Sequence, residues 1–421
     1  MLKLRILHVV PTYLPALRYG GPIISVHGLC KALVRRGHEV HVYTTNVDGA
    51  GESDVPTGTP VDLDGVKVWY FSVPGLRRLY WSPAMKAALS ARMGSFDIVH
   101  THSVFLWPTW AAARAARHRQ VPYMLAPRGM LVRDLIRRKS RGLKHLWIRL
   151  IEQDNLRHAA AIHATSELEA EDLRAFGFVL PPIEVVPNGV DLATERGIGP
   201  ADERGIDLAA DRAGLLPDAA ATTSAGARLH ELMNAPYLLF IGRINWKKGL
   251  DRLLPALAAL PDIRLLIAGN DEENYQPVLE AQAQACGVAQ RTHFLGPVYG
   301  TDKLALLRGA QALVLPSYSE NFGNVVLEAM AAGCPVVLTA AVGAAEIVSQ
   351  SGAGLVVSGE APELAQALRQ ITTDGARRNH MGRLGLATVR ERFSWDAIAQ
   401  SMEACYGRAI DRTGGHAIHE A

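Results

Sequence analysis

The first half of the chain alternates short apolar runs with longer segments in which apolar residues recur every three or four positions. The runs include RILHVVP at 5–11, HEVHVYTT at 38–45, VKVWYF at 66–71 and FDIVHTHS at 96–103. Runs of this length predict buried strands, and the periodic segments between them predict helices. Strands that alternate with helices favour a parallel sheet covered on both faces.

The alternation stops after Asp191 and resumes near Tyr237. Residues 193–235 are rich in Ala, Gly, Asp and Thr and have weak periodicity. Beyond them, apolar runs such as YLLFIGR, IRLLIAGN and ALVLPS again predict strands. We therefore predict an α/β protein with two Rossmann-like, doubly wound domains, 1–192 and 236–394, which face each other across a cleft. The segment 193–235 is an insertion or linker, 395–411 is the last helix, and 412–421 is a tail.

The composition, net charge and cysteine content indicate which class of protein this chain belongs to. The chain has 421 residues, 48% of them hydrophobic and 20% charged, as expected for two globular domains. A net charge of +3 gives no reason to expect a nucleic-acid partner. The four cysteines have no paired spacing, which fits a reducing compartment. No run approaches the roughly 20 apolar residues that span a bilayer. We expect a cytoplasmic protein.

The loop after the first strand of the second half carries two cations. In FIGRINWKKG, at 240–249, Arg243 and Lys248 lie close enough in sequence to converge on one diphosphate. Two cations can offset the charge that builds on a departing phosphate without a metal. Taken alone, the loop is better explained as an ordinary basic turn between a strand and a helix.

A second loop of this half carries acids. In PSYSENFGNVVLEAMAAGCPVV, at 316–337, Glu320 lies on a turn after a strand, and Glu328 lies one to two turns into the next helix. The helix start near Gly323 and Asn324 suits an anion. The pattern suggests a phosphate held between two carboxylates that bind hydroxyls. A capped turn with one acid in a core helix is the alternative.

Three strand ends of the first half carry further candidates. YGGP has Gly20 and Gly21, HTHS has His100 and His102, and APRGM has Arg128. Ligands bind at the carboxyl ends of strands in such sheets, so these residues and the two loops can face one site. No Cys, Asp or His cluster is evident around the histidines, so no metal site is predicted. Each strand end, taken alone, is also compatible with a purely structural role.

With these residues in view, the chain resembles the retaining glycosyltransferases of the GT-B fold, and specifically glycosyltransferase family 4. SENFGNVVLEAMAAGCPVV matches the E-x7-E element of that family through Glu320 and Glu328. GRINWKKG matches its Arg and Lys pair, PNGVD its domain junction and YGGP its glycine loop. The resemblance covers nearly the whole chain except 193–235 and the tail. It implies that the helix at 395–411 crosses back to the first domain. VGAAE departs from the family at a position where Gly-Gly is common.

The resemblance implies a role for each matching residue. Arg243 and Lys248 would hold the donor diphosphate, and Glu328 would bind the ribose. Glu320 would contact the transferred sugar, with the backbone of the next loop residues at its hydroxyls or phosphates; those residues are Phe322, Gly323 and Asn324. His102 would lie near the reacting sugar, and Gly20 and Gly21 near the diphosphate or acceptor. The family is metal-independent, so we expect no cofactor besides the nucleotide sugar.

The acceptor is less evident. Residues 128–149 place eight Arg and Lys among Leu, Ile and Trp147, a pattern that suits anionic membrane surfaces and lipid diphosphates and equally a solvated basic helix pair. Arg128 and His100 are candidates on the acceptor side. We hypothesise a lipid-linked saccharide acceptor at the inner membrane face, in polysaccharide biosynthesis. The alternatives are a nucleotide-sugar 2-epimerase and a non-catalytic nucleotide-sugar-binding protein.

Overall fold

The computed structural model describes residues 3–16, 18, 20–132, 146–192 and 224–414. Within it the chain divides into two compact units, which we call the N-terminal and C-terminal domains. The N-terminal domain contains residues up to Gly189 together with the last helix, α16 (Trp395–Arg412). The C-terminal domain runs from Val190 to Ser394. The predicted basic residues at 133–145, most of the insertion and the end of the tail lie outside the described residues.

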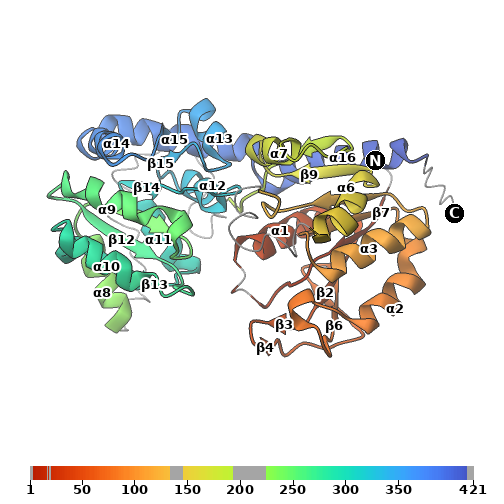
Figure 1. Cartoon of the computed structure of the whole chain (residues 1–421). Coiled ribbons are helices and arrows are strands. Elements are labelled where there is room, and N and C mark those ends of the chain that lie inside the picture. Colours follow the sequence, from red (N-terminus) through yellow and green to blue (C-terminus); the bar gives the residue numbers. More distant parts are fainter. Residues whose placement is uncertain (1–2, 17, 19, 133–145, 193–223, 415–421) are drawn as a thin grey trace. The chain divides into compact units, whose positions relative to one another are not determined.

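An eight-stranded sheet forms the N-terminal domain (Figure 1). In spatial order its strands are β10 (Ile183–Val185), β9 (Ala161–Ala164), β8 (Tyr123–Ala126), β7 (Ile98–His102), β1 (Arg5–Val9), β2 (Glu39–Thr45), β6 (Val66–Phe71) and β5 (Pro60–Leu63). All neighbours pair in parallel except β5, which forms an antiparallel hairpin with β6. A small hairpin joins β3 (Val47–Asp48) to β4 (Gly51–Glu52).

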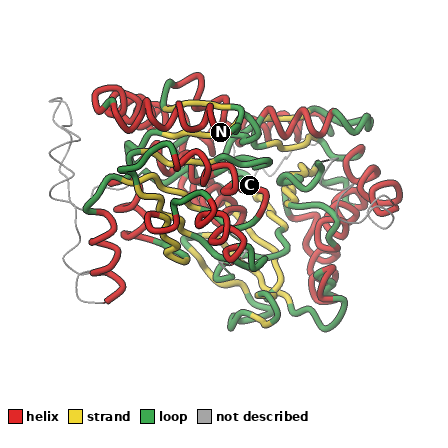
Figure 2. The backbone as a smooth tube through the Cα atoms, turned by 60° about the vertical axis from the view of Figure 1, so that its left-hand side comes forward, coloured by secondary structure: helices red, strands yellow, loops and turns green. Residues whose placement is uncertain are grey.

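Helices cover both faces of this sheet, as the tube view shows (Figure 2). They are α1 (Gly21–Arg35), α2 (Pro83–Arg92), α3 (Trp107–His118), α6 (Gln153–Arg157), α7 (Glu167–Arg174) and α16, with a π-helix at Ile148–Glu152 before α6. The two-sided burial explains why the strands read as nearly continuous apolar runs rather than as alternating ones.

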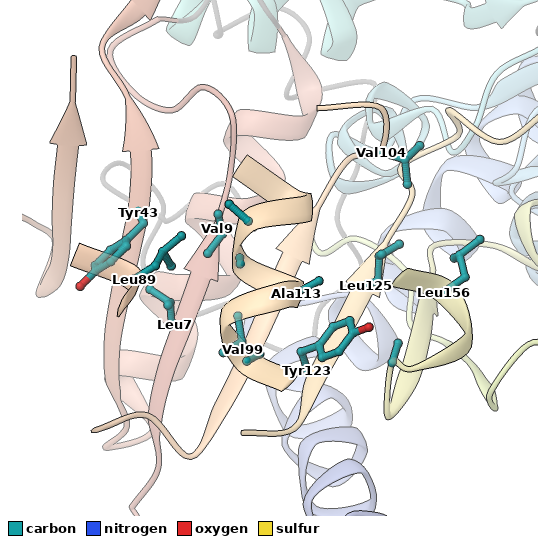
Figure 3. Packing of buried hydrophobic residues seen from close by; sticks show 14 of the residues in the cluster. Leu7, Val9, Tyr43, Leu89, Val99, Val104, Ala113, Tyr123, Leu125 and Leu156 are labelled. Atoms are coloured by element: carbon teal, nitrogen blue, oxygen red, sulfur yellow. The ribbon is translucent and has the colours of Figure 1, made fainter. Parts of the chain in front are cut away.

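Strand alternation separates two kinds of side chain in the centre of this sheet. Leu7 and Val99 point into the cluster that α2 and α3 cover, where they pack with Leu89 and Ala113 (Figure 3). Because successive side chains on a strand point to opposite faces, His8 points to the other face. His100 and His102 lie on that same opposite face, since β7 continues through both.

The helix α16 packs on α1 within the N-terminal domain. Trp395 occupies space that a Cβ on Gly28 or Gly189 would fill, since such an atom would lie 2.3 or 2.5 Å from its ring. Further along the helix, the buried Glu403 accepts hydrogen bonds from Arg36 at 2.7 and 2.9 Å. Two glycines that make room for Trp395, together with the ion pair between Arg36 and the buried Glu403, therefore hold the last helix on the N-terminal domain.

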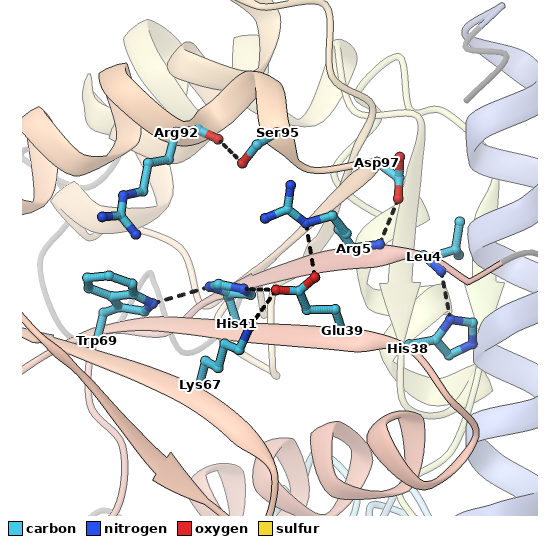
Figure 4. A network of polar contacts seen from close by, with 10 residues as sticks. All are labelled: Leu4, Arg5, His38, Glu39, His41, Lys67, Trp69, Arg92, Ser95 and Asp97. Atoms are coloured by element: carbon cyan, nitrogen blue, oxygen red, sulfur yellow. Dashed lines mark hydrogen bonds and ion pairs between the residues drawn. The ribbon is translucent and has the colours of Figure 1, made fainter. Parts of the chain in front are cut away.

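A polar network lies at the amino ends of the central strands (Figure 4). The Glu39 carboxylate accepts hydrogen bonds from Lys67 at 2.6 Å and from the His41 ring at 3.0 Å. These contacts lower the pKa of Glu39 to about 2. The His41 ring in turn accepts a bond from the Trp69 indole at 3.2 Å. The network is an ordinary means of satisfying polar groups where strands enter a sheet.

The C-terminal domain is a six-stranded parallel sheet. In spatial order its strands are β13 (Thr292–Gly296), β12 (Arg264–Ala268), β11 (Tyr237–Ile241), β14 (Ala312–Leu315), β15 (Val336–Thr339) and β16 (Gly354–Val357). Its helices are α8 (Ser224–Met233), α9 (Leu250–Ala258), α10 (Gln276–Ala285), α11 (Gly300–Gly309), α12 (Asn324–Ala331), α13 (Ala345–Ser351), α14 (Ala361–Thr373) and α15 (Gly375–Arg392). The predicted pair of doubly wound α/β domains is confirmed. Among the described residues, no helix combines the length and apolar character needed to cross a bilayer.

Candidate active site

The basic loop of the C-terminal domain follows β11, a central strand of its sheet. Arg243 is exposed, and Lys248 is half-buried at the end of a 3₁₀ turn that spans Trp246–Lys248. Gly249 closes the turn with φ 65°, and a Cβ there would lie 2.0 Å from the carbonyl oxygen of Pro316. A glycine is therefore required at this position, both for the backbone conformation and for the close approach of the acidic loop.

The acidic loop follows β14, the strand beside β11. It joins the basic loop through a hydrogen bond from the Tyr318 N–H to the Lys247 carbonyl, at 2.7 Å. On its other side, Glu320 donates its N–H to the Ala341 carbonyl at 2.9 Å, and its own carbonyl accepts from Gly343 at 2.9 Å. The VGAAE segment that departs from the family pattern therefore fixes the backbone of the acidic loop.

The acidic loop leads directly into α12. Phe322 is buried at 3% exposure and anchors the turn, while Gly323 caps the helix with φ 86°. Asn324 is the first helical residue, so Glu328 lies one turn into the helix. The first backbone N–H groups of a helix have no partner within it and carry partial positive charge.

Each glutamate of the motif is matched with a lysine. Lys248 forms a hydrogen-bonded ion pair with Glu320, which brings together the two loops that follow β11 and β14. Lys303, near the start of α11, lies 2.5 Å from the Glu328 carboxylate. All four side chains are partly exposed. By contrast, Arg243 takes part in none of the ion pairs found among the described residues. Lys248 and Glu320 therefore meet at the ends of two adjacent strands, and Lys303 and Glu328 form a second pair between α11 and α12.

The candidates of the N-terminal domain have a different environment. His100 and His102 are 0% and 1% exposed, with ring centroids 4.3 Å apart. They are joined on the same face of the sheet by two further buried histidines, His8 from β1 and His163 from β9, and by Tyr406 from α16. Burial lowers the pKa of His8 and of His163 to about 3, and it lowers those of His100 and His102 well below the usual range. All four rings are therefore neutral near pH 7.

Arg128 lies at the partly exposed edge of this histidine group. It has φ 56°, a left-handed conformation that non-glycine residues seldom adopt. Its guanidinium donates to His102 Nδ1 at 3.2 Å and to the Asn188 side-chain oxygen at 3.0 Å. The next residue, Gly129, donates its N–H to the buried Glu169 carboxylate at 2.6 Å. Burial lowers the pKa of Arg128, and the nearby Glu169 partly opposes this shift.

The backbone directly after His102 is strained as well. Ser103 has φ 75° and Phe105 has φ 64°. The Phe105 N–H donates at 2.7 Å to Glu152, a fully buried carboxyl whose pKa is raised by burial. Unfavourable backbone conformations of this kind persist where the surrounding structure fixes them, and they cluster at functional sites.

The glycine loop caps α1. Gly20 has φ 76°, and a Cβ there would meet no atom within 4 Å, so its conformation rather than its surroundings calls for glycine. Gly21 begins the helix and Pro22 follows it. The described residues thus place Gly20 and Gly21 at a helix start, as the sequence predicted.

The sequence analysis missed three members of the histidine group: His8, His163 and Tyr406. A signal was present, because a histidine inside an apolar strand is unusual and both RILHVVP and AAIHATS contain one. The premise that no histidines cluster around His100 and His102 was wrong, since His8, His100 and His102 bring one nitrogen each within 4.8 Å of one another. Each ring nitrogen of these three residues already takes part in a hydrogen bond.

Comparison with known proteins settles the family. Residues 227–386 match the model of glycosyl transferases group 1, and residues 20–189 match that of the glycosyl transferase 4-like domain. The chain is 31% identical over 411 residues to a D-inositol 3-phosphate glycosyltransferase of Xylanimonas cellulosilytica, with 93% of both chains covered. This protein belongs to the glycosyltransferase family. An uncharacterized glycosyltransferase of Methanocaldococcus jannaschii is 27% identical, with 94% and 96% covered.

Solved structures agree on the fold of this glycosyltransferase. Sucrose-phosphate synthase from Thermosynechococcus elongatus superimposes with a TM-score of 0.72 at 23% identity, covering 97% of this chain and all of the other. HepE of Anabaena, solved with UDP and glucose, gives a TM-score of 0.71 at 20% identity, with 96% and 99% covered. The GT-B fold expected from the sequence motifs is thereby confirmed.

Proposed function

We propose that this glycosyltransferase moves a sugar from a nucleotide diphosphate sugar to a hydroxyl of an acceptor, with retention of anomeric configuration and without a metal ion. The observation that carries the proposal is the meeting of Lys248 and Glu320 at the ends of two adjacent strands. A cation for a diphosphate and a carboxylate for sugar hydroxyls lie side by side there. A related fold, HepE, was solved with UDP-glucose, which makes uridine nucleotides the first donors to test.

In this proposal Arg243 and Lys248 bind the diphosphate of the donor, and Glu328 binds the ribose hydroxyls. Lys248 is paired with Glu320, so a diphosphate that draws the ammonium to itself leaves the Glu320 carboxylate for a sugar hydroxyl. The backbone from Phe322 to Asn324 adds N–H groups at the start of α12. Two cations supply charge for the leaving diphosphate, which is why no metal is needed.

Retention follows, in our proposal, from attack on the same face that the diphosphate leaves. The leaving phosphate helps to remove the proton of the incoming hydroxyl. Glu320 binds sugar rather than acting as a covalent nucleophile, in keeping with the role that the family resemblance implies for it. Trapping a glycosyl group covalently on Glu320 would contradict this assignment.

For the acceptor we propose a phosphorylated molecule with a free hydroxyl. Support comes from Arg128, a partly exposed residue at a strand end, and from the Xylanimonas relative, which is named a D-inositol 3-phosphate glycosyltransferase. A lipid-linked saccharide diphosphate shares this chemistry. Most of the basic stretch that suggested a membrane-bound acceptor lies outside the described residues.

The test begins with thermal shifts of the full chain in UDP-glucose, UDP-galactose, UDP-N-acetylglucosamine and GDP-mannose, since a ligand of the folded state raises the melting temperature. The stabilising donor is then incubated with inositol phosphate or with a short-chain lipid diphosphate saccharide, in EDTA. We expect nucleoside diphosphate release that depends on the acceptor, and a product whose anomeric configuration matches the donor. Isomerised donor without release would indicate an epimerase. Donor binding with neither reaction would indicate a binding protein.

A further inference from the structure

One continuous chain of hydrogen bonds crosses the buried histidine group of the N-terminal domain. It starts at the partly exposed guanidinium of Arg128 and ends at a backbone carbonyl oxygen. In order, its members are Arg128, His102, His8, Tyr406, His100, His163 and the carbonyl of Val186. Six of these come from five different strands or loops, since His100 and His102 share β7, and Tyr406 comes from the last helix.

The direction of the chain is fixed from its first member. Arginine only donates hydrogen bonds, so His102 Nδ1 must accept from Arg128, at 3.2 Å. In a neutral ring the proton then lies on Nε2, which donates to His8 Nδ1 at 2.9 Å. His8 therefore also carries its proton on Nε2 and donates to the Tyr406 hydroxyl oxygen at 3.4 Å.

The direction is fixed independently from the other end. A carbonyl oxygen only accepts, so His163 Nε2 must donate to Val186, at 2.8 Å. His163 Nδ1 is then an acceptor for His100 Nε2, at 3.2 Å. His100 Nδ1 in turn accepts from the Tyr406 hydroxyl at 2.9 Å. Both ends thus assign the same Nε2–H tautomer to all four histidines, and they meet without conflict at Tyr406.

We propose that Tyr406 is a positioning residue for His102: by accepting from His8 and donating to His100, it holds His102 in the Nε2–H tautomer with Nδ1 as an acceptor. Tyr406 suits this place because its single hydroxyl oxygen can both donate and accept a hydrogen bond. A neutral histidine instead donates from one ring nitrogen and accepts at the other. The placing of His102 near the reacting sugar is what the family resemblance implies, and this inference depends on it and on the proposed function.

Removing the hydroxyl has a consequence that reaches Arg128. His8 Nε2–H would lose its acceptor in a fully buried place, which is costly. His8 could move its proton to Nδ1 only if His102 moved its own to Nδ1, and that proton would then oppose the guanidinium. A single hydroxyl on α16 thereby controls whether His102 Nδ1 carries a proton at the Arg128 end of the hydrogen-bond chain, where Arg128 is partly exposed.

The tautomer decides what chemistry His102 offers. With Nδ1 as acceptor, the ring can take a hydrogen bond from a substrate hydroxyl that displaces the Arg128 guanidinium. It cannot donate from that nitrogen. The expected partner is therefore a hydroxyl, of the sugar or of the acceptor, rather than a phosphate oxygen. The ability of His102 Nδ1 to accept a hydrogen bond therefore also depends on α16, because Tyr406 belongs to that helix.

The first measurement uses the wild-type protein. Ring ¹⁵N spectra of the full chain, labelled at histidine, distinguish Nδ1–H, Nε2–H and protonated rings. We expect four Nε2–H rings that stay neutral through the physiological pH range, assigned by single-histidine substitutions. A proton on Nδ1 of His102 or His8, or a charged ring in the chain at pH 7, would overturn the proposal without any need for a tyrosine variant.

The second measurement compares two buried tyrosines of the same domain. Tyr406→Phe removes the hydroxyl of the chain, whereas Tyr123→Phe removes a buried hydroxyl that bonds the Asn155 carbonyl at 2.5 Å outside it. We expect Tyr406→Phe to shift the ring ¹⁵N signals of His8 and His102 and to lower kcat roughly tenfold with little change in the donor KM. Tyr123→Phe should leave the ring ¹⁵N signals and kcat unchanged.

The two proposals fail separately. Unshifted His102 signals in Tyr406→Phe, or equal kinetic losses in the two variants, would refute the role of Tyr406 while leaving sugar transfer intact. If the wild-type protein transfers no sugar, the proposed function fails, and the spectra still report whether the chain has the assigned direction. A folded Tyr406→Phe protein with shifted spectra and unchanged kcat would show that the tautomer does not serve the reaction.

Discussion

At the ends of strands β7 and β9 the N-terminal domain buries neutral histidines, whereas at the ends of β11 and β14 the C-terminal domain keeps lysines and glutamates partly exposed. In the first domain the pKa of every ring in the chain is lowered by burial, and Arg128 is the charged member at its edge. In the second domain Lys248 pairs with Glu320, and Lys303 pairs with Glu328.

In our proposal, the two environments serve different parts of the transfer reaction. Neutral rings in a fixed tautomer give directed hydrogen bonds without a large desolvation cost of charge. Exposed ion pairs can exchange partners readily, because each contributes little to stability. The N-terminal domain is thus suited to orient hydroxyls, and the C-terminal domain to receive and release a charged nucleotide. Four predictions test this contrast, from the largest expected effect to the smallest.

Acid should destabilise the N-terminal domain first. The four buried histidines stay neutral in the folded state, with pKa values of about 3 for His8 and His163, whereas unfolded histidines titrate near 6.5. Their folded pKa values lie below the unfolded one, so the unfolded state binds more protons at acid pH. The stability they contribute is therefore complete above about pH 6.5 and is lost as the pH falls toward 3. Within that window, each ring lowers the free energy of unfolding by about 1.4 kcal/mol for each pH unit of acidification.

The measurement is denaturant unfolding between pH 7.5 and about 4.5, with pulsed hydrogen exchange to separate the two sheets. We expect protection in β1, β7 and β9 to be lost at a higher pH than in β11 and β14. Glu39, whose folded pKa is lowered to about 2, contributes stability that is lost only as the pH falls from about 4.3 toward 2, below the range of this measurement. Equal acid sensitivity of both sheets would contradict the contrast.

Removing a cation from the C-terminal domain should reduce activity strongly. Lys248→Met deletes the ammonium that pairs with Glu320 and, in our proposal, binds the diphosphate. Charge-assisted hydrogen bonds contribute about 1.5–3 kcal/mol, so kcat/KM should fall roughly ten- to hundredfold or more. Lys247→Met, one position earlier in the same turn, is the matched control and should lose less than about threefold. Similar losses in both variants would remove Lys248 from the donor site.

Glu328→Gln should weaken donor binding without affecting the fold. Exchange of a carboxylate for an amide keeps the shape and weakens bonds to ribose hydroxyls, at a cost of about 1.4 kcal/mol or roughly tenfold in Kd. Calorimetric titration of the nucleoside diphosphate gives the affinity directly. Glu280→Gln on α10, an exposed acid that bonds Gln276, is the control. A Kd equal to the control value would exclude Glu328 from the ribose.

Much of this contrast could be predicted from the sequence, and the missing part has a physical reason. Arg243, Lys248, Glu320 and Glu328 lie in local motifs, so spacing along the chain was enough to find them. The histidine group is assembled from three strands, β1, β7 and β9, and the last helix, which are distant in sequence. Only the register that sets His8 beside His100 brings those rings together. The pairing between strands and the packing of α16 depend on contacts between residues distant in sequence, which local periodicity does not predict.

The smallest effect is expected at Lys303, which the sequence did not mark at all. Its ammonium lies 2.5 Å from Glu328, and both side chains are about one-quarter exposed. Partly exposed pairs of this kind contribute about 0.2–1 kcal/mol and weaken in salt. Lys303→Met should therefore lower the melting temperature slightly at low salt and less at high salt, while Lys247→Met does not. The variant leaves the Glu328 carboxylate with one partner fewer, so the donor Kd should change less than about threefold. A tenfold weakening would instead make Lys303 part of the donor site, and the C-terminal domain would then bind its nucleotide with three cations rather than two.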